Sequence, residues 1–250
     1  MNVVVNGLMT NYQKVGKGKT LLFLHGWGDS SETFAQLTEQ LKNQYTLLLL
    51  NMPGFGGAEP PHEAWGLIDY ARFVSAWLKK IDADPIYAVV GHSFGGSIVI
   101  VGVSSEQIKA DKVVLLASGG IRNKNFVKKK ALYLAAKTLK VPLRLLFPRK
   151  VEKIKSGFYK KIGSDLLLIP HMRQTFIKMV REDVQLQAKA VKQPTLLIYG
   201  DKDRETPVSY GHLLAADIPN SHLEIIPATG HFLHQEKPEQ VAGLIKKFLN

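Results

Sequence analysis

Cysteine is absent from the 250-residue chain. Its absence excludes a disulfide scaffold, a zinc ribbon, a thiol nucleophile and a Cys-x-x-Cys redox motif, and it fits a reducing compartment. The chain also lacks a charge-free apolar run of about 18 residues, which a membrane-spanning helix requires. The first residues carry no basic region followed by an apolar core, so we expect no signal peptide and a cytoplasmic location.

Acidic residues are the minority charge, with 21 Asp and Glu against 33 Lys and Arg and a net charge of +12. The imbalance lies in one segment: residues 121–190 hold 18 basic and 4 acidic residues, whereas the rest of the chain holds 15 and 17. Such a segment can attract nucleic acid, anionic lipid headgroups or acidic substrates. A solvated helical face, on which lysine stems cover apolar surface, explains the same composition, and we favour it. We therefore expect no nucleic-acid partner and keep contact with an anionic surface as the alternative.

Short apolar runs alternate with helical patterns along most of the chain. Asn6-Gly7 is a hairpin dipeptide between two short predicted strands. Further strands, most of them followed by a segment of helical periodicity, are predicted at 21–24, 45–50, 86–90, 113–117, 195–199 and 223–226. Continuous apolar strands that alternate with helices indicate the α/β class, with a mostly parallel sheet covered by helices on both faces.

Residues 121–190 interrupt this alternation. Helical patterns occur there at 128–140 and 173–190, without a clear strand between them. We interpret the segment as a basic helical cap, or lid, inserted into a core domain made of residues 1–120 and 191–250.

Motifs for phosphate, dinucleotide and metal binding are missing or incomplete. Gly18-Lys19-Thr20 is similar to the end of a P-loop, but the position that needs the first glycine holds Gln13. No Gly-x-Gly-x-x-Gly occurs, and the pair His231 and His234 has no carboxylate-rich cluster near it in the sequence. We therefore expect neither a metal nor a cofactor.

Residues 91–95 read Gly-His-Ser-Phe-Gly and match the pattern Gly-x-Ser-x-Gly. The pattern directly follows the predicted strand at 86–90 and opens a helix, which is the setting of a nucleophile elbow. In such an elbow the serine has a strained backbone, and the residues two before and two after it must be small. Ser93 is therefore the candidate nucleophile, with Gly91 and Gly95 permitting the turn. The alternative is a structural turn whose hydroxyl caps a helix.

A serine hydroxyl needs a base, which is commonly a histidine oriented by a carboxylate. His231 lies between the last predicted strand and the last predicted helix and is our candidate base, with His234 as the nearest rival. Several carboxylates follow the predicted strand at 195–199. We choose Asp203 as the orienting acid and keep Asp201 as the alternate.

Two preorganised backbone N–H groups are expected to bind an oxyanion at such a site. One belongs to Phe94, which follows the nucleophile. We assign the other to Trp27, in the glycine-rich loop after the predicted strand at 21–24. In this loop Gly26 and Gly28 would let the backbone approach a substrate, and His25 precedes them. A plain glycine-rich turn is the alternative interpretation.

These motifs together resemble the α/β-hydrolase superfamily over nearly the whole chain. The residues that carry the resemblance are His25-Gly26-Trp27-Gly28, Met52-Pro53-Gly54-Phe55-Gly56, Gly91-His92-Ser93-Phe94-Gly95-Gly96, Gly200-Asp201-Lys202-Asp203 and Gly230-His231. The resemblance implies an eight-stranded sheet, a helical cap after the sixth strand, and Ser93, Asp203 and His231 as the catalytic triad. It favours Asp203 over Asp201, because in the family the acid usually ends the Gly-x-x-Asp run.

The expected function is that of a serine carboxylesterase, which cleaves small-molecule esters of short or medium acyl groups through an acyl-enzyme. Lactonase, thioesterase, amidase and C–C bond hydrolase activities use the same triad. The loop at 25–28 differs from the Ser-Gly-Pro-Gly form common in C–C bond hydrolases, which counts against that activity. A ligand-binding or receptor-type protein with slow turnover is the alternative from a different class.

Overall fold

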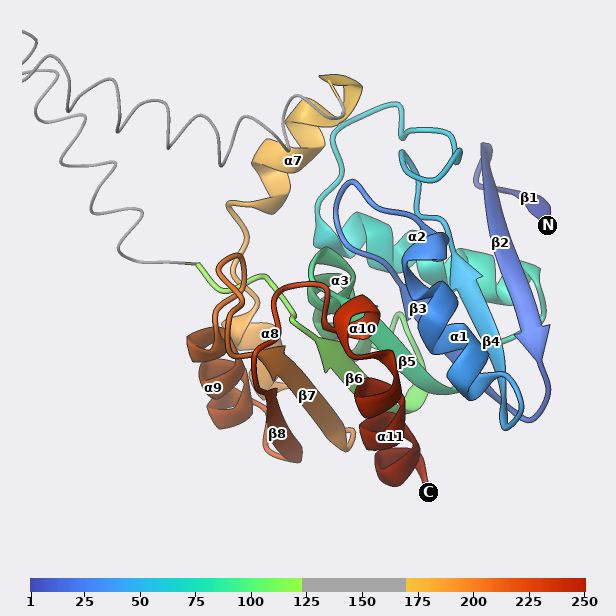
Figure 1. Cartoon of the computed structure of the whole chain (residues 1–250). Coiled ribbons are helices and arrows are strands. Elements are labelled where there is room, and N and C mark those ends of the chain that lie inside the picture. The colour runs from blue at the N-terminus through green and yellow to red at the C-terminus, as the bar shows by residue number, and fades with distance from the viewer. Residues whose placement is uncertain (123–169) are drawn as a thin grey trace, which may run out of the picture.

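The computed structural model describes residues 1–122 and 170–250, which fold around an eight-stranded sheet (Figure 1). The strands are β1 (Asn2–Val5), β2 (Leu8–Gly16), β3 (Lys19–Leu24), β4 (Tyr45–Leu50), β5 (Ile86–His92), β6 (Ala110–Leu116), β7 (Thr195–Gly200) and β8 (Ser221–Ile226). The helices are η1 (Ser31–Phe34), α1 (Ala35–Leu41), α2 (Leu67–Lys80), α3 (Phe94–Ser104), η2 (Pro170–Met172), α7 (Arg173–Met179), α8 (Gln185–Lys189), α9 (Val208–Asp217), α10 (Leu233–Glu236) and α11 (Pro238–Leu249). None of the described helices combines the length and the apolar character needed to cross a membrane.

The strand order is β1-β2-β4-β3-β5-β6-β7-β8. Strands β3 to β8 run parallel to one another, whereas β2 pairs antiparallel with both β1 and β4. In the turn between β1 and β2, Asn6 and Gly7 have φ angles of 50° and 80°, the left-handed values that a two-residue hairpin turn requires. The predicted α/β fold with a mostly parallel sheet and a leading antiparallel hairpin is confirmed.

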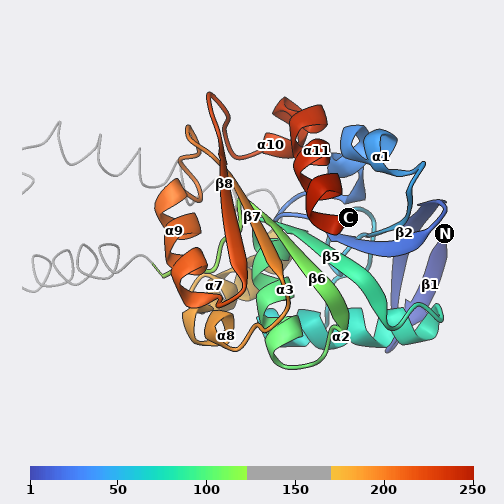
Figure 2. The same cartoon turned by 90° about the horizontal axis from the view of Figure 1, so that it is seen from below.

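Each face of the sheet packs against its own layer of helices (Figure 2). Helices α1 and α11 cover one face, and α2, α3, α8 and α9 cover the other. The strands supply side chains to both layers in alternation: Leu21 and Phe23 of β3 belong to the first core, Leu22 and Leu24 to the second. Burial on both faces explains why the strands appear in the sequence as continuous apolar runs.

The helical stretch predicted at 173–190 is present but interrupted, because the chain forms two short helices there. Helix α7 ends at Met179 and α8 begins at Gln185. Between them Glu182 accepts hydrogen bonds from the N–H of Leu67 at 3.2 and 3.3 Å, and Asp183 accepts one from the N–H of Gln185 at 2.9 Å. A hydrogen bond from a backbone N–H to a side chain two residues earlier, as between Gln185 and Asp183, favours a turn over a continuous helix.

The predicted helix at 128–140 and most of the predicted cap lie outside the described residues. The division into core and cap therefore stays a prediction. The described end of that segment contacts the rest of the molecule through α8, which packs on α3 and α9.

Candidate active site

Ser93 occupies a sharp turn between β5 and α3. Its φ of 51° and ψ of −113° lie outside the conformations that ordinary residues prefer. The turn depends on its glycines: a Cβ atom on Gly91 would lie 2.7 Å from the carbonyl group of Gly95, and one on Gly95 would lie 2.1 Å from the Leu24 carbonyl oxygen. The N–H of Ser93 donates to the Leu116 carbonyl at 3.0 Å, which fixes the turn against β6. The hydroxyl is thereby held at the carboxyl edge of the parallel strands.

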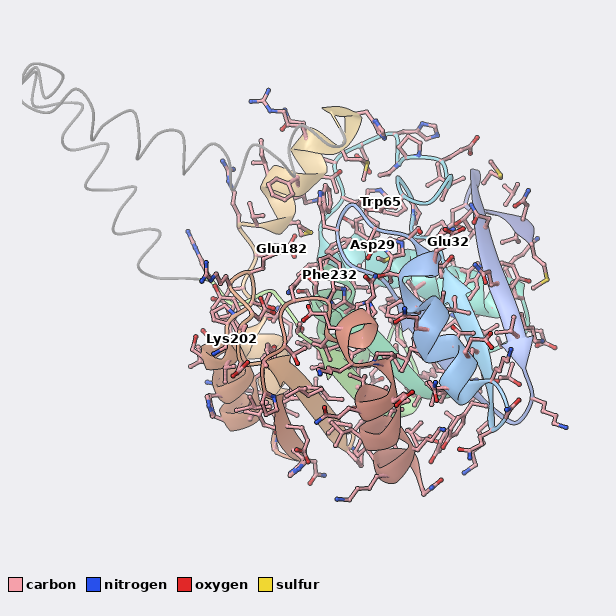
Figure 3. All side chains as sticks on the ribbon, viewed as in Figure 1. Asp29, Glu32, Trp65, Glu182, Lys202 and Phe232 are labelled. Carbon is pink, nitrogen blue, oxygen red and sulfur yellow. The ribbon has the colours of Figure 1, made fainter. Side chains whose placement is uncertain are left out.

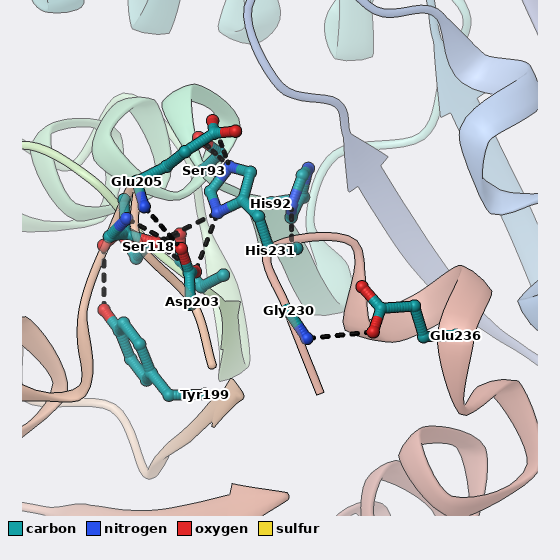
Figure 4. Close-up of polar contacts among 11 residues, drawn as sticks. His92, Ser93, Ser118, Tyr199, Asp203, Glu205, Gly230, His231 and Glu236 are labelled. Atoms are coloured by element: carbon teal, nitrogen blue, oxygen red, sulfur yellow. Dashed lines mark hydrogen bonds and ion pairs between the residues drawn. The ribbon is translucent and has the colours of Figure 1, made fainter. Parts of the chain in front are cut away.

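The imidazole of His231 lies between Ser93 and Asp203 (Figure 4). Its Nε2 is 3.0 Å from Ser93 Oγ, and its Nδ1 is 2.8 Å from Asp203 Oδ2. Because an ionised carboxylate only accepts hydrogen bonds, Nδ1 carries the proton and Nε2 is left to accept the serine hydroxyl. The structure thus brings together the three side chains that the sequence nominated from widely separated segments.

Asp203 is held by a dense set of donors at the end of β7. Its Oδ1 accepts from the N–H groups of Glu205 at 2.8 Å and Thr206 at 3.0 Å, and its Oδ2 accepts from Thr206 Oγ1 at 2.8 Å. Burial alone would raise the pKa of Asp203, but the hydrogen bonds from His231 and Thr206 outweigh it and lower the pKa. The carboxylate is therefore ionised at neutral pH and suited to orient His231.

Thr206 is a site residue that the sequence analysis missed. Besides Asp203, its hydroxyl oxygen lies 3.1 Å from His231 Nδ1 and 2.9 Å from the Ala117 carbonyl oxygen, which is the alternative acceptor for its one proton. A Thr three residues after an Asp is the spacing of a side-chain turn, and this signal could have drawn attention to it.

The alternate acid, Asp201, does not reach the imidazole. Its Oδ1 accepts from the N–H of Thr229 at 3.2 Å, and its other oxygen lies 3.6 Å from Lys202 Nζ. Asp201 therefore ties the loop after β7 to the loop after β8, while Asp203 contacts His231.

The loop after β3 lies beside the nucleophile. A Cβ atom on Gly26 would lie 3.5 Å from the Ser93 Cβ, and Gly28 has a φ of 74°. Within residues 1–122 and 170–250, the backbone N–H groups of Trp27 and Phe94 find no acceptor. The assignment of these two N–H groups as the donors to an oxyanion stays a prediction.

His25 anchors this loop rather than facing the reaction centre. Its Nε2 accepts from the N–H of Met52 at 3.1 Å, and its Nδ1 lies 2.8 Å from the Gly26 carbonyl oxygen. Burial lowers the pKa of His25 to about 4, so the ring is neutral at neutral pH.

Two further histidines, His92 and His234, pack near the candidate base. His92 Nε2 donates to the His231 carbonyl at 3.0 Å, and burial, together with the neighbouring histidines, lowers its pKa well below the usual range. His234, the rival candidate base, is bonded through Nε2 to Thr33 Oγ1 at 2.9 Å. Burial lowers the pKa of His234 to about 3. Both rings are neutral packing and positioning groups, and neither replaces His231 at Ser93.

A cluster of aromatic rings, here called the aromatic wall, surrounds Trp27. Trp27 belongs to the loop after β3, residues 25–28, here called the oxyanion loop. The Trp27 ring lies 4.9 Å from Phe55, 5.5 Å from Phe94 and 5.1 Å from Phe176, measured between centroids. Phe176 belongs to α7, so this helix supplies one of the rings in contact with Trp27. No cluster of three or more potential metal-binding side chains occurs among the described residues.

A mostly parallel eight-stranded sheet with Ser, Asp and His in this chain order defines the class of α/β hydrolases. The family model for the alpha/beta hydrolase fold matches residues 19–238, and the chain belongs to this family.

Its relatives include several hydrolases. The uncharacterized hydrolase YugF of Bacillus subtilis is 27% identical over 98% of this chain and 94% of its own length. The 2-hydroxymuconate semialdehyde hydrolase of Pseudomonas putida is 26% identical over 99% of this chain and 92% of its own length. Among solved structures, a thermophilic esterase from Thermogutta terrifontis superposes with a TM-score of 0.78 at 18% identity, covering 100% of this chain and 98% of that one. Family membership and these relatives support hydrolase activity.

Proposed function

We propose that the protein is a serine carboxylesterase that hydrolyses small-molecule esters through an acyl-enzyme. The observation that carries the proposal is the continuous chain of contacts from Ser93 Oγ to His231 Nε2 at 3.0 Å and from His231 Nδ1 to Asp203 at 2.8 Å. Nucleophile, base and orienting acid in hydrogen-bond contact are the arrangement that nucleophilic acyl transfer needs.

In the acylation step His231 Nε2 takes the proton of the Ser93 hydroxyl while Oγ attacks the ester carbonyl carbon. The carbonyl oxygen gains the negative charge and accepts hydrogen bonds from the N–H groups of Trp27 and Phe94. Each such donor contributes about 10²–10³ in kcat where it has been removed in other enzymes. The tetrahedral intermediate then breaks its bond to the alcohol oxygen, which receives the proton from His231 Nε2, and the acyl group remains on Ser93.

In the deacylation step a water molecule replaces the alcohol. His231 Nε2 takes one water proton as the oxygen attacks the acyl carbon, the same two N–H groups bind the oxyanion, and the proton passes to Ser93 Oγ as the carboxylic acid leaves. Asp203 stays ionised throughout and stabilises the imidazolium that forms in each half of the cycle.

The aromatic wall is evidence that the acyl group of the substrate is apolar. Rings of Trp27, Phe55 and Phe176 next to the oxyanion loop offer burial to hydrocarbon and little hydrogen bonding. We therefore expect esters of short or medium apolar acyl groups to be hydrolysed.

The relative named 2-hydroxymuconate semialdehyde hydrolase favours a second candidate, hydrolysis of a C–C bond on the same triad. A panel of p-nitrophenyl esters, lactones, acyl thioesters and a vinylogous diketone acid separates the candidates, with Ser93→Ala as the control. The carboxylesterase proposal expects multiple turnovers of the oxygen esters that are lost in Ser93→Ala. Inertness toward every oxygen ester contradicts it, and a single turnover points to a ligand-binding protein instead.

A further inference from the structure

The carboxylate of Glu205 lies at the rim of the candidate site and has no part in the steps above. Its Oε2 is 3.5 Å from His231 Nε2, the nitrogen that faces Ser93. The Glu205 side chain is 61% exposed, whereas that of His231 is 8% exposed. In Figure 4 the carboxylate of Glu205 lies above the imidazole beside Ser93, and Asp203 lies below it. The triad histidine thus has a buried carboxylate on one nitrogen and a solvated one near the other.

The position of Glu205 is set by the same turn that holds the orienting acid. Its backbone N–H donates to Asp203 Oδ1 at 2.8 Å, and the next residue, Thr206, binds the same carboxylate through both its N–H and its hydroxyl. The Glu205 side chain therefore projects from a fixed point of the site.

The Glu205 carboxylate meets His231 across the mouth of the site, at 3.5 Å from its Nε2. This contact is an ion pair only when the imidazole is protonated, and the nearby Lys202 pairs with Asp201 at 3.6 Å. Because a general base must lack the proton that it is to accept, the imidazole does not balance the Glu205 carboxylate when a substrate approaches for acylation. At a separation of a few ångströms near the surface, such a charge attracts cations and repels anions measurably.

The reaction geometry places one particular part of an ester next to this charge. The leaving alcohol oxygen takes its proton from His231 Nε2, so it must come within hydrogen-bond reach of that nitrogen. Glu205 Oε2 is 3.5 Å from the same atom. The alcohol part of the ester therefore passes beside Glu205, whereas the acyl part faces the oxyanion loop.

We propose that Glu205 is a specificity-determining residue that selects esters with a cationic alcohol part over esters with an anionic one. This inference rests on the proposed esterase function, because it assigns the side of the site that the alcohol part occupies.

The experiment compares three butyrate esters whose alcohol parts differ in charge: choline, its neutral analogue 3,3-dimethylbutanol, and the carboxylate-bearing 4-hydroxybutanoate. kcat/KM is measured for the wild type, for Glu205→Gln, and for Glu239→Gln, which removes an exposed carboxylate from α11. At about 10 mM salt the cation-to-anion ratio of kcat/KM is expected to fall about tenfold in Glu205→Gln and to stay at the wild-type value in Glu239→Gln. The difference shrinks near 0.5 M salt, because the Debye length falls from about 30 Å to about 4 Å.

A second measurement separates this inference from the esterase proposal. Phosphonothioates that release the thiol counterparts of the same three alcohols label a nucleophilic serine without any turnover: the Ser93 Oγ–P bond forms, the P–S bond breaks, and the charged thiol leaves as the alcohol of an ester does. If no ester is hydrolysed but the cationic reagent labels Ser93 faster and loses that advantage in Glu205→Gln, the esterase proposal fails and the role of Glu205 stands. An unchanged ratio in Glu205→Gln, an equal change in Glu239→Gln, an equal loss for all three charges, or no labelling of Ser93 overturns the role of Glu205.

Discussion

At the scale of single residues, the turn at Ser93 leaves little room for a side chain at Gly91 or Gly95. We expect Gly91→Ala to lower the free energy of unfolding by about 2–4 kcal/mol, because the new Cβ would lie 2.7 Å from backbone atoms that cannot move independently. Urea denaturation measures the change.

Gly243 on α11 provides the matched control. A Cβ atom there would meet nothing within 4 Å, and the position is exposed within a helix. Gly243→Ala should therefore raise the stability by up to about 1 kcal/mol. Equal effects of the two substitutions would contradict the steric account of the turn.

Thr206 tests how far the orienting acid depends on its neighbour. Thr206→Val removes a donor to Asp203 Oδ2 at nearly constant volume. Since this hydrogen bond lowers the pKa of Asp203, the acidic limb of the kcat/KM profile should move to higher pH, and kcat should fall about tenfold, the equivalent of roughly 1.4 kcal/mol.

Thr38→Val is the control for this pH profile, because the buried Thr38 hydroxyl has no hydrogen-bond partner among the described residues. Its profile should match that of the wild type. A Thr206→Val enzyme with an unshifted profile would show that the hydroxyl only fills space.

At the scale of the elements, the segment from Thr175 to Glu182 bonds to the residues that begin α2, in addition to the packing of α8 on α3 and α9. Glu182 accepts from the N–H of Leu67 at the start of α2, and Lys178 lies 3.1 Å from Asp69. Figure 3 labels Glu182 together with Trp65, whose N–H donates to Thr175 of α7 at 3.2 Å.

Glu182→Ala leaves the first amide of α2 without its acceptor. We expect faster hydrogen exchange at Leu67 and a loss of about 1–2 kcal/mol in stability, the usual effect of removing a helix cap. Asp111→Ala, an exposed change on β6, should leave the exchange at Leu67 unchanged. Unaltered protection of Leu67 in Glu182→Ala would mean that the contact does not hold the helix.

Most elements were predictable because their pattern is local. The strands are buried on both faces and therefore read as continuous apolar runs, and α2 shows the helical spacing of its buried side. Helix α10 and the break between α7 and α8 were not predictable in this way. The break depends on Glu182 reaching Leu67, a contact between residues 115 positions apart.

The same distinction applies to the site. Ser93 and His231 could be nominated because each stands in a recognisable strand–loop–helix context. Glu205 and Thr206 gain their positions only when the loop after β7 folds against the loop after β8, so nothing in their immediate neighbours in the sequence marked them beyond the Asp-to-Thr spacing.

At the scale of the whole molecule, the buried neutral histidines determine how the free energy of unfolding changes as the pH falls. The pKa values of His25 and His234 are lowered to about 4 and about 3, and that of His92 is lowered well below its usual range. The unfolded chain protonates these rings near pH 6.5 while the folded chain keeps them neutral, so stability is lost as pH falls from about 6.5 toward 4. The slope should reach about 3–4 kcal/mol per pH unit near pH 5, since each group contributes up to about 1.4.

Urea denaturation between pH 7 and pH 5 measures this slope. His234→Gln should reduce it by about 1 kcal/mol per pH unit, whereas His222→Gln, at an exposed site, should not change it. A stability that is flat between pH 6.5 and pH 5 would contradict the assignment of neutral buried rings.

The central claim is that Ser93 forms the covalent intermediate after His231 removes the proton from its hydroxyl. Mass spectrometry of the protein treated with a fluorophosphonate, followed by peptide mapping, tests it most directly. The account predicts one adduct on Ser93, none in Ser93→Ala, and labelling slowed by at least about 10³ in His231→Ala. An adduct on another residue, or labelling of Ser93 at the wild-type rate without His231, would contradict it.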